Sequence, residues 1–170
     1  MRKYFLVSYL LMLVLQILIC NYLQVSPYIT LSILPVMVLM LPIRYGTVVA
    51  MILAFLSGLS IDFLAEGLTG INSLAIVPVA LLRTPISRMV FGSAIFSRRE
   101  DISIRRHGLI KMATAITIAQ SLFLILYIWA DTAGTRPFTF CLLRFILSLI
   151  PGVLLSLPIS NILSSDGRDL

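Results

Sequence analysis

Charged residues are scarce in this sequence. Asp, Glu, Lys and Arg make up 12% of the 170 residues and hydrophobic residues 59%, whereas soluble domains carry roughly 25% charged residues. So little charge cannot cover a globule of this length, which excludes a soluble domain. The uncharged runs are long, and the longest separates Lys3 from Arg44. Because a membrane helix needs roughly 20 mainly apolar residues and leaves no backbone polar group unpaired, the sequence predicts an all-α polytopic membrane protein with one transmembrane domain over 1–170.

Reactive side chains are also few. The two cysteines, Cys20 and Cys141, stand in apolar stretches without a CxxC pair, and the one histidine, His107, lies in a polar stretch. This pattern excludes a cysteine–histidine metal cluster. The seven acidic residues are scattered, without the paired-acid motifs of intramembrane aspartyl proteases or lipoprotein signal peptidases, and the Gly-x-Ser-Gly of rhomboids is missing. We therefore predict no metal, no cofactor and no catalytic residue.

The hydrophobic pattern predicts six membrane-spanning helices. They cover approximately residues 4–24, 28–43, 46–64, 70–90, 110–130 and 138–162. With the N-terminus inside, nearly all basic residues fall in cytoplasmic segments and Arg136 alone falls in an outer loop, as the positive-inside rule requires. Five spans would put Arg2 and Lys3 on the opposite side of the membrane from the basic loop over 91–109. We therefore expect six spans with both termini in the cytoplasm (N-in/C-in).

The loop over 91–109 is the main polar segment. Seven charged residues fall within positions 98–111, and five of them are basic. Such a loop holds the topology and attracts anionic lipid, by about 1 kcal/mol for each basic residue near the surface; docking of a cytoplasmic partner is the alternative. Nothing in the loop resembles a nucleic-acid-binding module. We therefore attribute the net charge of +6 to topology and membrane lipid, and expect no nucleic-acid partner.

A proline pattern recurs at the inner ends of the second, fourth and sixth predicted spans. Residues 35–43, 78–86 and 151–159 each read Pro-x-x-x-Leu-x-x-Pro-Ile. Prolines seven residues apart lie on one face of a helix, two turns apart. Either the chain holds three related hairpins with bent even-numbered helices, or the pattern is a coincidence in a chain rich in Pro and Leu.

Three ionisable residues fall at membrane depth, where a charge costs about 2.5–3.5 kcal/mol or more and is commonly functional. Asp62 lies near the outer end of the third span, and Arg144 lies in the outer half of the sixth. We predict that they pair, directly or through Glu66, and tie these helices together; the alternative is that each reaches the outer interface alone. Arg83 lies toward the inner end of the fourth span, and its long side chain is expected to reach the cytoplasmic interface unless a neighbouring helix supplies an acceptor.

The third predicted span also carries small residues at intervals of four. Ala50, Ala54 and Gly58 form one face that ends at Asp62. Faces of this kind let membrane helices approach closely. The sequence leaves open whether the partner helix belongs to the same chain or to another.

The residues around this face resemble the signature of the MreD family, the rod-shape-determining membrane proteins of bacteria. Residues 58–62 (GLSID) followed eight positions later by Gly70 match its central motif, and residues 41–46 (LPIRYG) match the basic turn before the same helix. Residues 82–85 (LRTP) resemble a Leu-Arg-Pro element with Thr84 inserted. The motif resemblance covers about 41–85, and elsewhere only the hydropathy agrees.

This resemblance implies a fold and a function. The fold would be similar to that of the substrate-binding subunits of energy-coupling-factor vitamin transporters. The protein would be a non-enzymatic subunit of the cell-elongation machinery in the bacterial inner membrane, binding an MreC-like periplasmic scaffold and the cytoskeletal MreB system that direct peptidoglycan synthesis. It makes Gly58, Asp62 and Gly70 structural or interface candidates; Arg44, Arg83 and Arg144 complete the candidate set.

A second function comes from a different class. A vitamin-binding S component of an energy-coupling-factor transporter has a comparable six-helix bundle, docks its membrane partner through an Ala-x-x-x-Ala face on the first helix, and supplies ligand-binding groups from its outer loops. Residues 5–20 here contain neither Ala nor Gly, and the predicted outer loops hold few polar groups. This favours the cell-elongation subunit.

Overall fold

The computed structural model describes residues 2–22, 28–43, 45–67, 70–92, 108–133 and 135–163. Its described part is helical, without strands. The elements are α1 (Arg2–Tyr22), α2 (Leu34–Leu39), α3 (Thr47–Ile61), the π-helical turn η1 (Asp62–Glu66), α4 (Ile71–Phe91), α7 (Leu109–Thr132) and α8 (Phe138–Leu163). The predicted all-α class is thus confirmed. Arg44 and most of the predicted basic loop over 91–109 lie outside the described residues.

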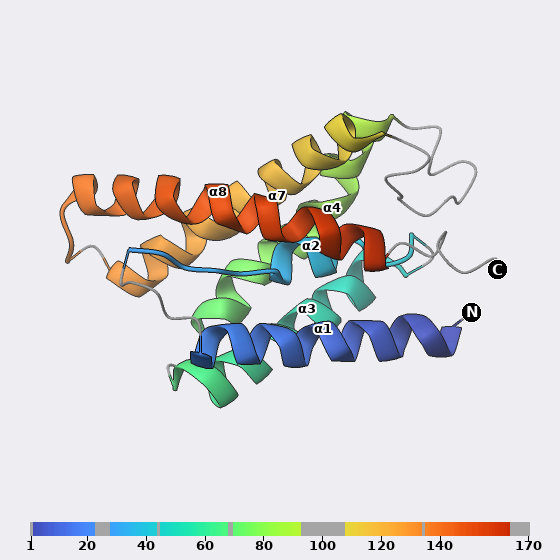
Figure 1. Ribbon diagram of the computed structural model, residues 1–170, viewed down its shortest axis with the longest axis horizontal. Helices are drawn as coiled ribbons and strands as arrows, with labels where there is room; N and C mark the ends of the chain where they lie inside the picture. Colours follow the sequence, from blue (N-terminus) through green and yellow to red (C-terminus); the bar gives the residue numbers. More distant parts are fainter. Residues whose placement is uncertain are drawn as a thin grey trace.

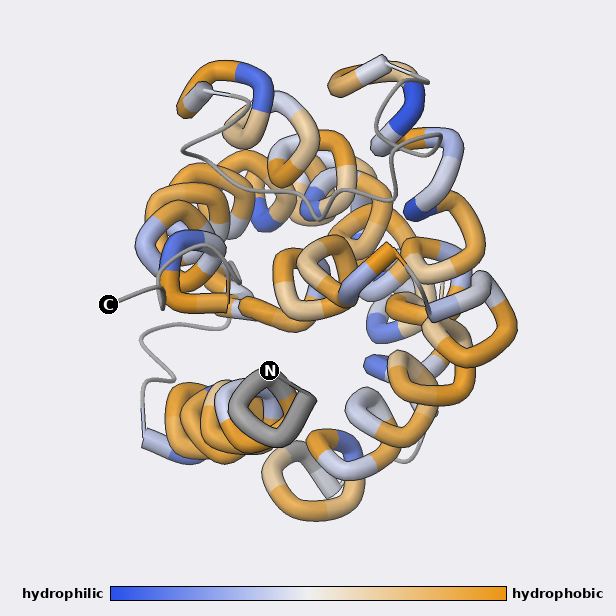
Figure 2. Tube along the Cα trace, turned by 90° about the vertical axis from the view of Figure 1, so that its right-hand side faces the viewer, coloured by the Kyte–Doolittle hydropathy of each residue, from blue (hydrophilic) through white to orange (hydrophobic). Residues whose placement is uncertain are grey.

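Four helical stretches in the described residues are long and apolar enough to cross a membrane. They are α3 continued by η1 (Thr47–Ala65), α4, α7 and α8. The apolar part of α1, Leu6–Tyr22, is shorter. Hydrophobic residues predominate in the helices, with polar residues scattered among them (Figure 2). These observations make the protein a membrane protein, as predicted.

The prediction of a helix over 28–43 is wrong in its extent, because only the six residues of α2 are helical. Two prolines account for this. Pro35 lies in the first turn of α2 and has no N–H to donate to the carbonyl of Leu31, which instead accepts a hydrogen bond from Gln16 Nε2 at 3.2 Å. Pro42 likewise cannot donate to Val38, so the helix ends before it. Residues 28–33, called here the extended segment, are not helical.

The segment that contains α2 runs lengthwise through the bundle (Figure 1). At one end the ring of Tyr28 lies 5.1 Å from that of Phe140 near the start of α8. At the other end the carbonyl of Pro42 accepts a hydrogen bond from Arg83 in the C-terminal half of α4. A helix of 16 residues would be about 24 Å long, less than the ~30 Å hydrocarbon core of a bilayer. The non-helical residues 28–33 let the same segment cover more distance than a helix of equal length, because an α-helix advances only about 1.5 Å per residue.

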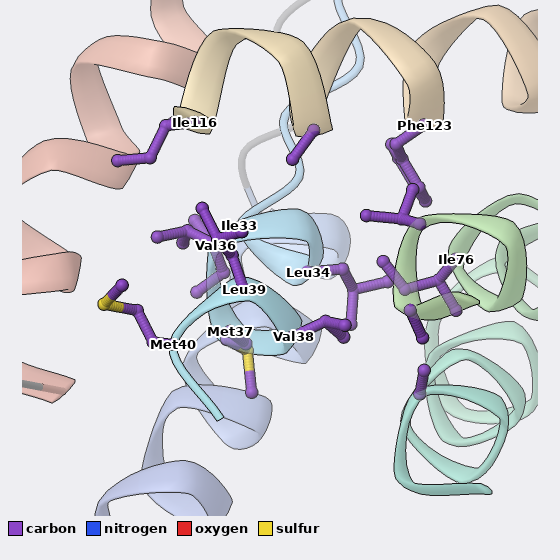
Figure 3. Close-up of a cluster of buried hydrophobic side chains, with 14 of the residues drawn as sticks. Ile33, Leu34, Val36, Met37, Val38, Leu39, Met40, Ile76, Ile116 and Phe123 are labelled. Carbon is purple, nitrogen blue, oxygen red and sulfur yellow. The ribbon is translucent and has the colours of Figure 1, made fainter. Parts of the chain in front are cut away.

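The core is built around α2. All six of its residues are buried, and Figure 3 shows that Leu34 and Val38 point toward Ile76 of α4 whereas Val36 and Met40 point to the opposite side. A helix that is apolar around its whole circumference is stable only where it is enclosed. The short helix therefore forms the centre, and the longer helices surround it.

The proline pattern is not equivalent in its three copies. The prolines of 35–43 lie at the start of α2 and beyond its end, whereas those of α4 and α8 lie inside continuous helices. The hypothesis of three related hairpins with the same bent helix is therefore wrong for the first copy.

The two ends of the bundle differ in composition. Exposed aromatic residues stand where α1 ends, in η1, in the last turn of α7 and where α8 begins, at the left end in Figure 1; they are Tyr22, Phe63, Trp129 and Phe138. Two exposed basic residues lie near the opposite end, Arg88 in the last turn of α4 and Lys111 in the first turn of α7, and one, Arg136, lies at the aromatic end just before α8. Aromatic residues are enriched at membrane–water interfaces, and basic residues in cytoplasmic segments.

Candidate functional site

The carboxylate of Asp62 is the best-connected polar group of the described residues. It is 0% exposed. Its Oδ2 accepts hydrogen bonds from the N–H of Gly70 (3.1 Å), the N–H of Ser73 (3.2 Å) and the hydroxyl of Ser73 (3.0 Å). Its Oδ1 accepts from the N–H and the side-chain Nδ2 of Asn72, at 2.9 and 3.0 Å. The first residue of η1 thus caps the N-terminus of α4 from outside that helix.

This arrangement satisfies groups that a helix leaves open. The first N–H groups of an α-helix have no partner within it, and the N-terminus carries a partial positive charge. A buried carboxylate at that place is therefore stabilised without an opposite side-chain charge. All five groups facing Asp62 donate to it, so both carboxylate oxygens serve as acceptors. We call Asp62, Gly70, Asn72 and Ser73 the Asp62 clasp.

Local backbone geometry brings the clasp together. The π-helical turn η1 follows α3 directly and ends at Gly67, which has φ +66°; Gly70, just before α4, has φ +104°. Both are in the left-handed region, which costs other residues roughly 1–2 kcal/mol. The N–H groups of α4 can therefore turn back toward Asp62 because glycines stand at these two positions.

Close packing of α3 on α4 is the second part of the site. A Cβ atom on Gly58 would lie 2.7 Å from the backbone N and Cα of Ser73, so the two helices touch at this point. Ala50 and Ala54, on the same face of α3, are buried. The small-residue face therefore packs within this chain, which answers the question that the sequence left open. Gly58 and the clasp lie one helical turn apart and lock the same helix pair.

The predicted direct pair between Asp62 and Arg144 is wrong. Arg144 donates through Nη1 to the carboxylate of Asp131 and through Nε to Thr30 Oγ1 at 3.2 Å. Its guanidinium also lies 5.7 Å from the ring centre of Tyr127. The physical reason is chain proximity: Asp131 lies in the last turn of α7 and Arg144 lies in α8, the next helix along the chain. The predicted indirect link between Asp62 and Arg144 through Glu66 is not described, because the side chain of Glu66 lies outside the described residues.

The ion pair is partly shielded, since the side chains of Arg144 and Asp131 are 12% and 25% exposed. Arg144→Gln or Asp131→Asn alone is expected to lower the free energy of unfolding by about 1–3 kcal/mol, because the remaining charge loses its partner. Equilibrium unfolding in detergent should show that the double variant loses less than the sum of the two. Strict additivity would contradict a direct pair. The matched control is Arg136→Gln, which replaces an exposed arginine and should change the free energy of unfolding little.

Arg83 does not extend to the cytoplasmic interface as expected. Its side chain is buried, with 6% exposure, and Nη2 donates to the carbonyl of Pro42 at 3.1 Å. The acceptor is supplied by the non-helical chain just after α2 and not by a neighbouring helix, the exception stated above. Arg83 therefore joins α4 to the segment that runs through the core.

Sequence reasoning missed two glutamines that hold the extended segment, the first of them on α1. Gln16 Oε1 accepts from the N–H of Ile33 at 2.8 Å, and Nε2 donates to the carbonyl of Leu31 at 3.2 Å. This amide replaces the backbone bonds that the extended segment does not make. A lone glutamine in the middle of a long apolar helix was the signal that pointed to it.

The second glutamine lies on α7. Gln120 Nε2 donates to the carbonyl of Ser32 at 3.1 Å, and on α8 the hydroxyl of Ser148 accepts from the N–H of Thr30 at 2.9 Å. Non-helical backbone at membrane depth is tolerated only where protein or water satisfies it. Side chains from α1, α7 and α8 do so for the extended segment.

The carboxylates of Asp62 and Asp131 lie in structural contacts. Among the described residues, no three His, Cys, Asp or Glu side chains gather in a group that could hold a metal ion. Asp62 and Asp131 have separate partners, on α4 and α8. Comparisons with family models, curated proteins and solved structures returned no significant match for the chain.

Proposed function

We propose that the chain is a non-enzymatic, MreD-like subunit of the bacterial cell-elongation machinery, which binds an MreC-like scaffold in the inner membrane and helps to direct peptidoglycan synthesis. One observation carries the proposal. Gly58, Asp62 and Gly70, which carry the sequence resemblance, act together in locking α3 on α4. Residues that resemble a family signature are thus the ones on which this helix pair depends.

The use of polar groups supports a binding rather than a chemical role. The carboxylates of Asp62 and Asp131 are occupied by hydrogen bonds and an ion pair within the bundle. The outward surface is apolar, and α8 exposes most of its length. Such a surface serves contact with lipid and with the helices of other membrane proteins.

The proposal includes six passes with both termini in the cytoplasm. The segment over 28–43 is the second pass, partly extended and partly helical. Its direction in Figure 1 is opposite to that of α1 and α3, as alternating passes require. The aromatic end of the bundle is then the outer one and the basic end the inner one.

The only tryptophan tests this orientation. Trp129 is 69% exposed in the last turn of α7. Proteoliposomes are captured through a tag on the cytoplasmic side, so that this side faces the bulk solution and the opposite side of the protein faces the vesicle lumen. Iodide enclosed in the lumen should then quench the fluorescence of Trp129. A matched variant, Trp129→Phe with Ile110→Trp, moves the probe to an exposed position at the start of the same helix and should be shielded. The reverse pattern would contradict the orientation.

The function itself is tested by its partners. A tagged chain, solubilised in mild detergent from the membranes of a rod-shaped bacterium that carries it, should recover the MreC-like scaffold. An unrelated six-span protein with the same tag is the control. Recovery of a transporter ATPase, or a stoichiometric vitamin in the purified protein, would overturn the proposal in favour of the transporter S component.

A further inference from the structure

A continuous patch of aromatic and cationic side chains lies at the aromatic end of the bundle. The guanidinium of Arg136 lies over the ring of Phe140, 5.3 Å from its centre, and that ring lies 5.1 Å from the ring of Tyr28. Arg136 is exposed, and Tyr28 is 41% exposed. These three side chains form one surface, called here the Arg136 patch, which joins the chain before α8 to the first turn of α8 and to the extended segment.

Backbone hydrogen bonds fix the chain on both sides of Arg136. On one side, the N–H and the hydroxyl of Thr135 donate to the carbonyl of Thr132 at 2.8 and 2.7 Å. On the other side, the N–H of Phe140 donates to the carbonyl of Pro137 at 3.0 Å. The guanidinium is therefore presented on a surface that is already formed, which lowers the entropy cost of binding a partner.

The two arginines at this end of the bundle are used differently. The side chain of Arg144 is 12% exposed and pairs with Asp131 inside the chain, whereas Arg136 faces outward and forms no ion pair within the part of the chain that the structure describes. In the proposed orientation Arg136 is also the one basic residue in an outer loop. The positive-inside rule expects few basic residues there, and the anionic lipid surface that attracts them belongs to the cytoplasmic leaflet. Neither topology nor anionic lipid therefore accounts for this cation.

We propose that the Arg136 patch binds a carboxylate in an acidic segment of the scaffold, on the outer side of the membrane; this inference rests on the proposed function. The planar guanidinium can donate two parallel N–H bonds to a carboxylate while its face stays on an aromatic ring. Arginine and tyrosine are also the residue types that contribute most to binding at protein–protein interfaces. The charge and the composition of the patch thus both favour an acidic protein segment.

Charge reversal in the full chain tests the patch. In the pull-down proposed above, performed in detergent without added phospholipid, Arg136→Glu should lower recovery of the scaffold about tenfold. Arg136→Lys should lower it by about threefold, because lysine keeps the charge but not the planar pair of donors. The matched control is Lys111→Glu, the same change of charge at an exposed residue of the opposite end, which should leave recovery unchanged.

The outcomes separate this inference from the proposed function. Equal recovery by Arg136→Glu and the parent chain would overturn the patch and leave the proposed function standing, whereas a parent chain that recovers no scaffold would overturn both. A loss that occurs only when phospholipid is added would assign Arg136 to a lipid phosphate and reject the acidic segment. If Arg136→Glu unfolds at a lower SDS fraction than the parent chain, Arg136→Gln decides by the same criteria.

Discussion

Replacing Asp62 by alanine is expected to lower the free energy of unfolding by about 3–5 kcal/mol, among the largest effects of a single substitution. The carboxylate accepts five hydrogen bonds from the start of α4, and its removal leaves these donors without a partner. Hydrogen bonds to charged groups contribute about 1.5–3 kcal/mol each, with incomplete additivity. Unfolding in mixed micelles with increasing SDS, followed by circular dichroism, measures the change.

The isosteric variant separates charge from shape. Asp62→Asn keeps the size of the side chain but turns an NH₂ group toward donors, so we expect a loss of about 2–4 kcal/mol. The matched control is Ser60→Ala, two residues earlier, whose hydroxyl bonds only to the carbonyl of Leu56 in its own helix; it should change stability by less than about 0.5 kcal/mol. An Asp62→Asn variant as stable as the parent chain would contradict the clasp.

The long helices were predictable because a membrane restricts the backbone conformations that a spanning segment can adopt. Uncharged runs predicted spans over 70–90, 110–130 and 138–162, and the helices occupy Ile71–Phe91, Leu109–Thr132 and Phe138–Leu163. In lipid, hydrophobicity and backbone hydrogen bonding both favour helix, so local composition is enough.

The structure of the segment over 28–43 was not predictable in this way. Its composition is as apolar as that of its neighbours, but the extended segment depends on side chains of other helices: Gln16 lies 17 residues from Ile33 in the sequence, and Gln120 lies 88 residues from Ser32. Hydropathy reports how much apolar surface a segment has and not which distant side chain will satisfy its backbone.

The candidate site was also predictable only in part. The cost of a charge at membrane depth identified Asp62 and Arg144 as residues that need partners, and both have them. The predicted partner was wrong, because an opposite charge is not the only group that stabilises a buried carboxylate. Asp62 uses the neutral N–H groups of a helix start, eight to eleven residues away, and Gly70 before Asn72 and Ser73 was the local sign of a helix N-terminus.

Replacing Gln16 by leucine is expected to lower the free energy of unfolding by about 2–4 kcal/mol. The substitution keeps an apolar helix apolar, so hydropathy alone would predict a neutral or stabilising change. It leaves the N–H of Ile33 and the carbonyl of Leu31 without their partner, and each unpaired buried group costs about 1–3 kcal/mol. The extended segment would lose its attachment to α1. The helix α1 otherwise makes only sparse contacts with the helices around it.

The same helix supplies the control for this prediction. Asn21 also carries a side-chain amide, but it is exposed and donates only to the carbonyl of Ile17, one turn back in α1. Asn21→Leu should therefore change stability by less than about 0.5 kcal/mol in the same SDS titration. If Gln16→Leu proved as stable as Asn21→Leu, the extended segment would not depend on the amide. A loss confined to Gln16 would show that one glutamine in an apolar helix maintains the non-helical backbone of the extended segment.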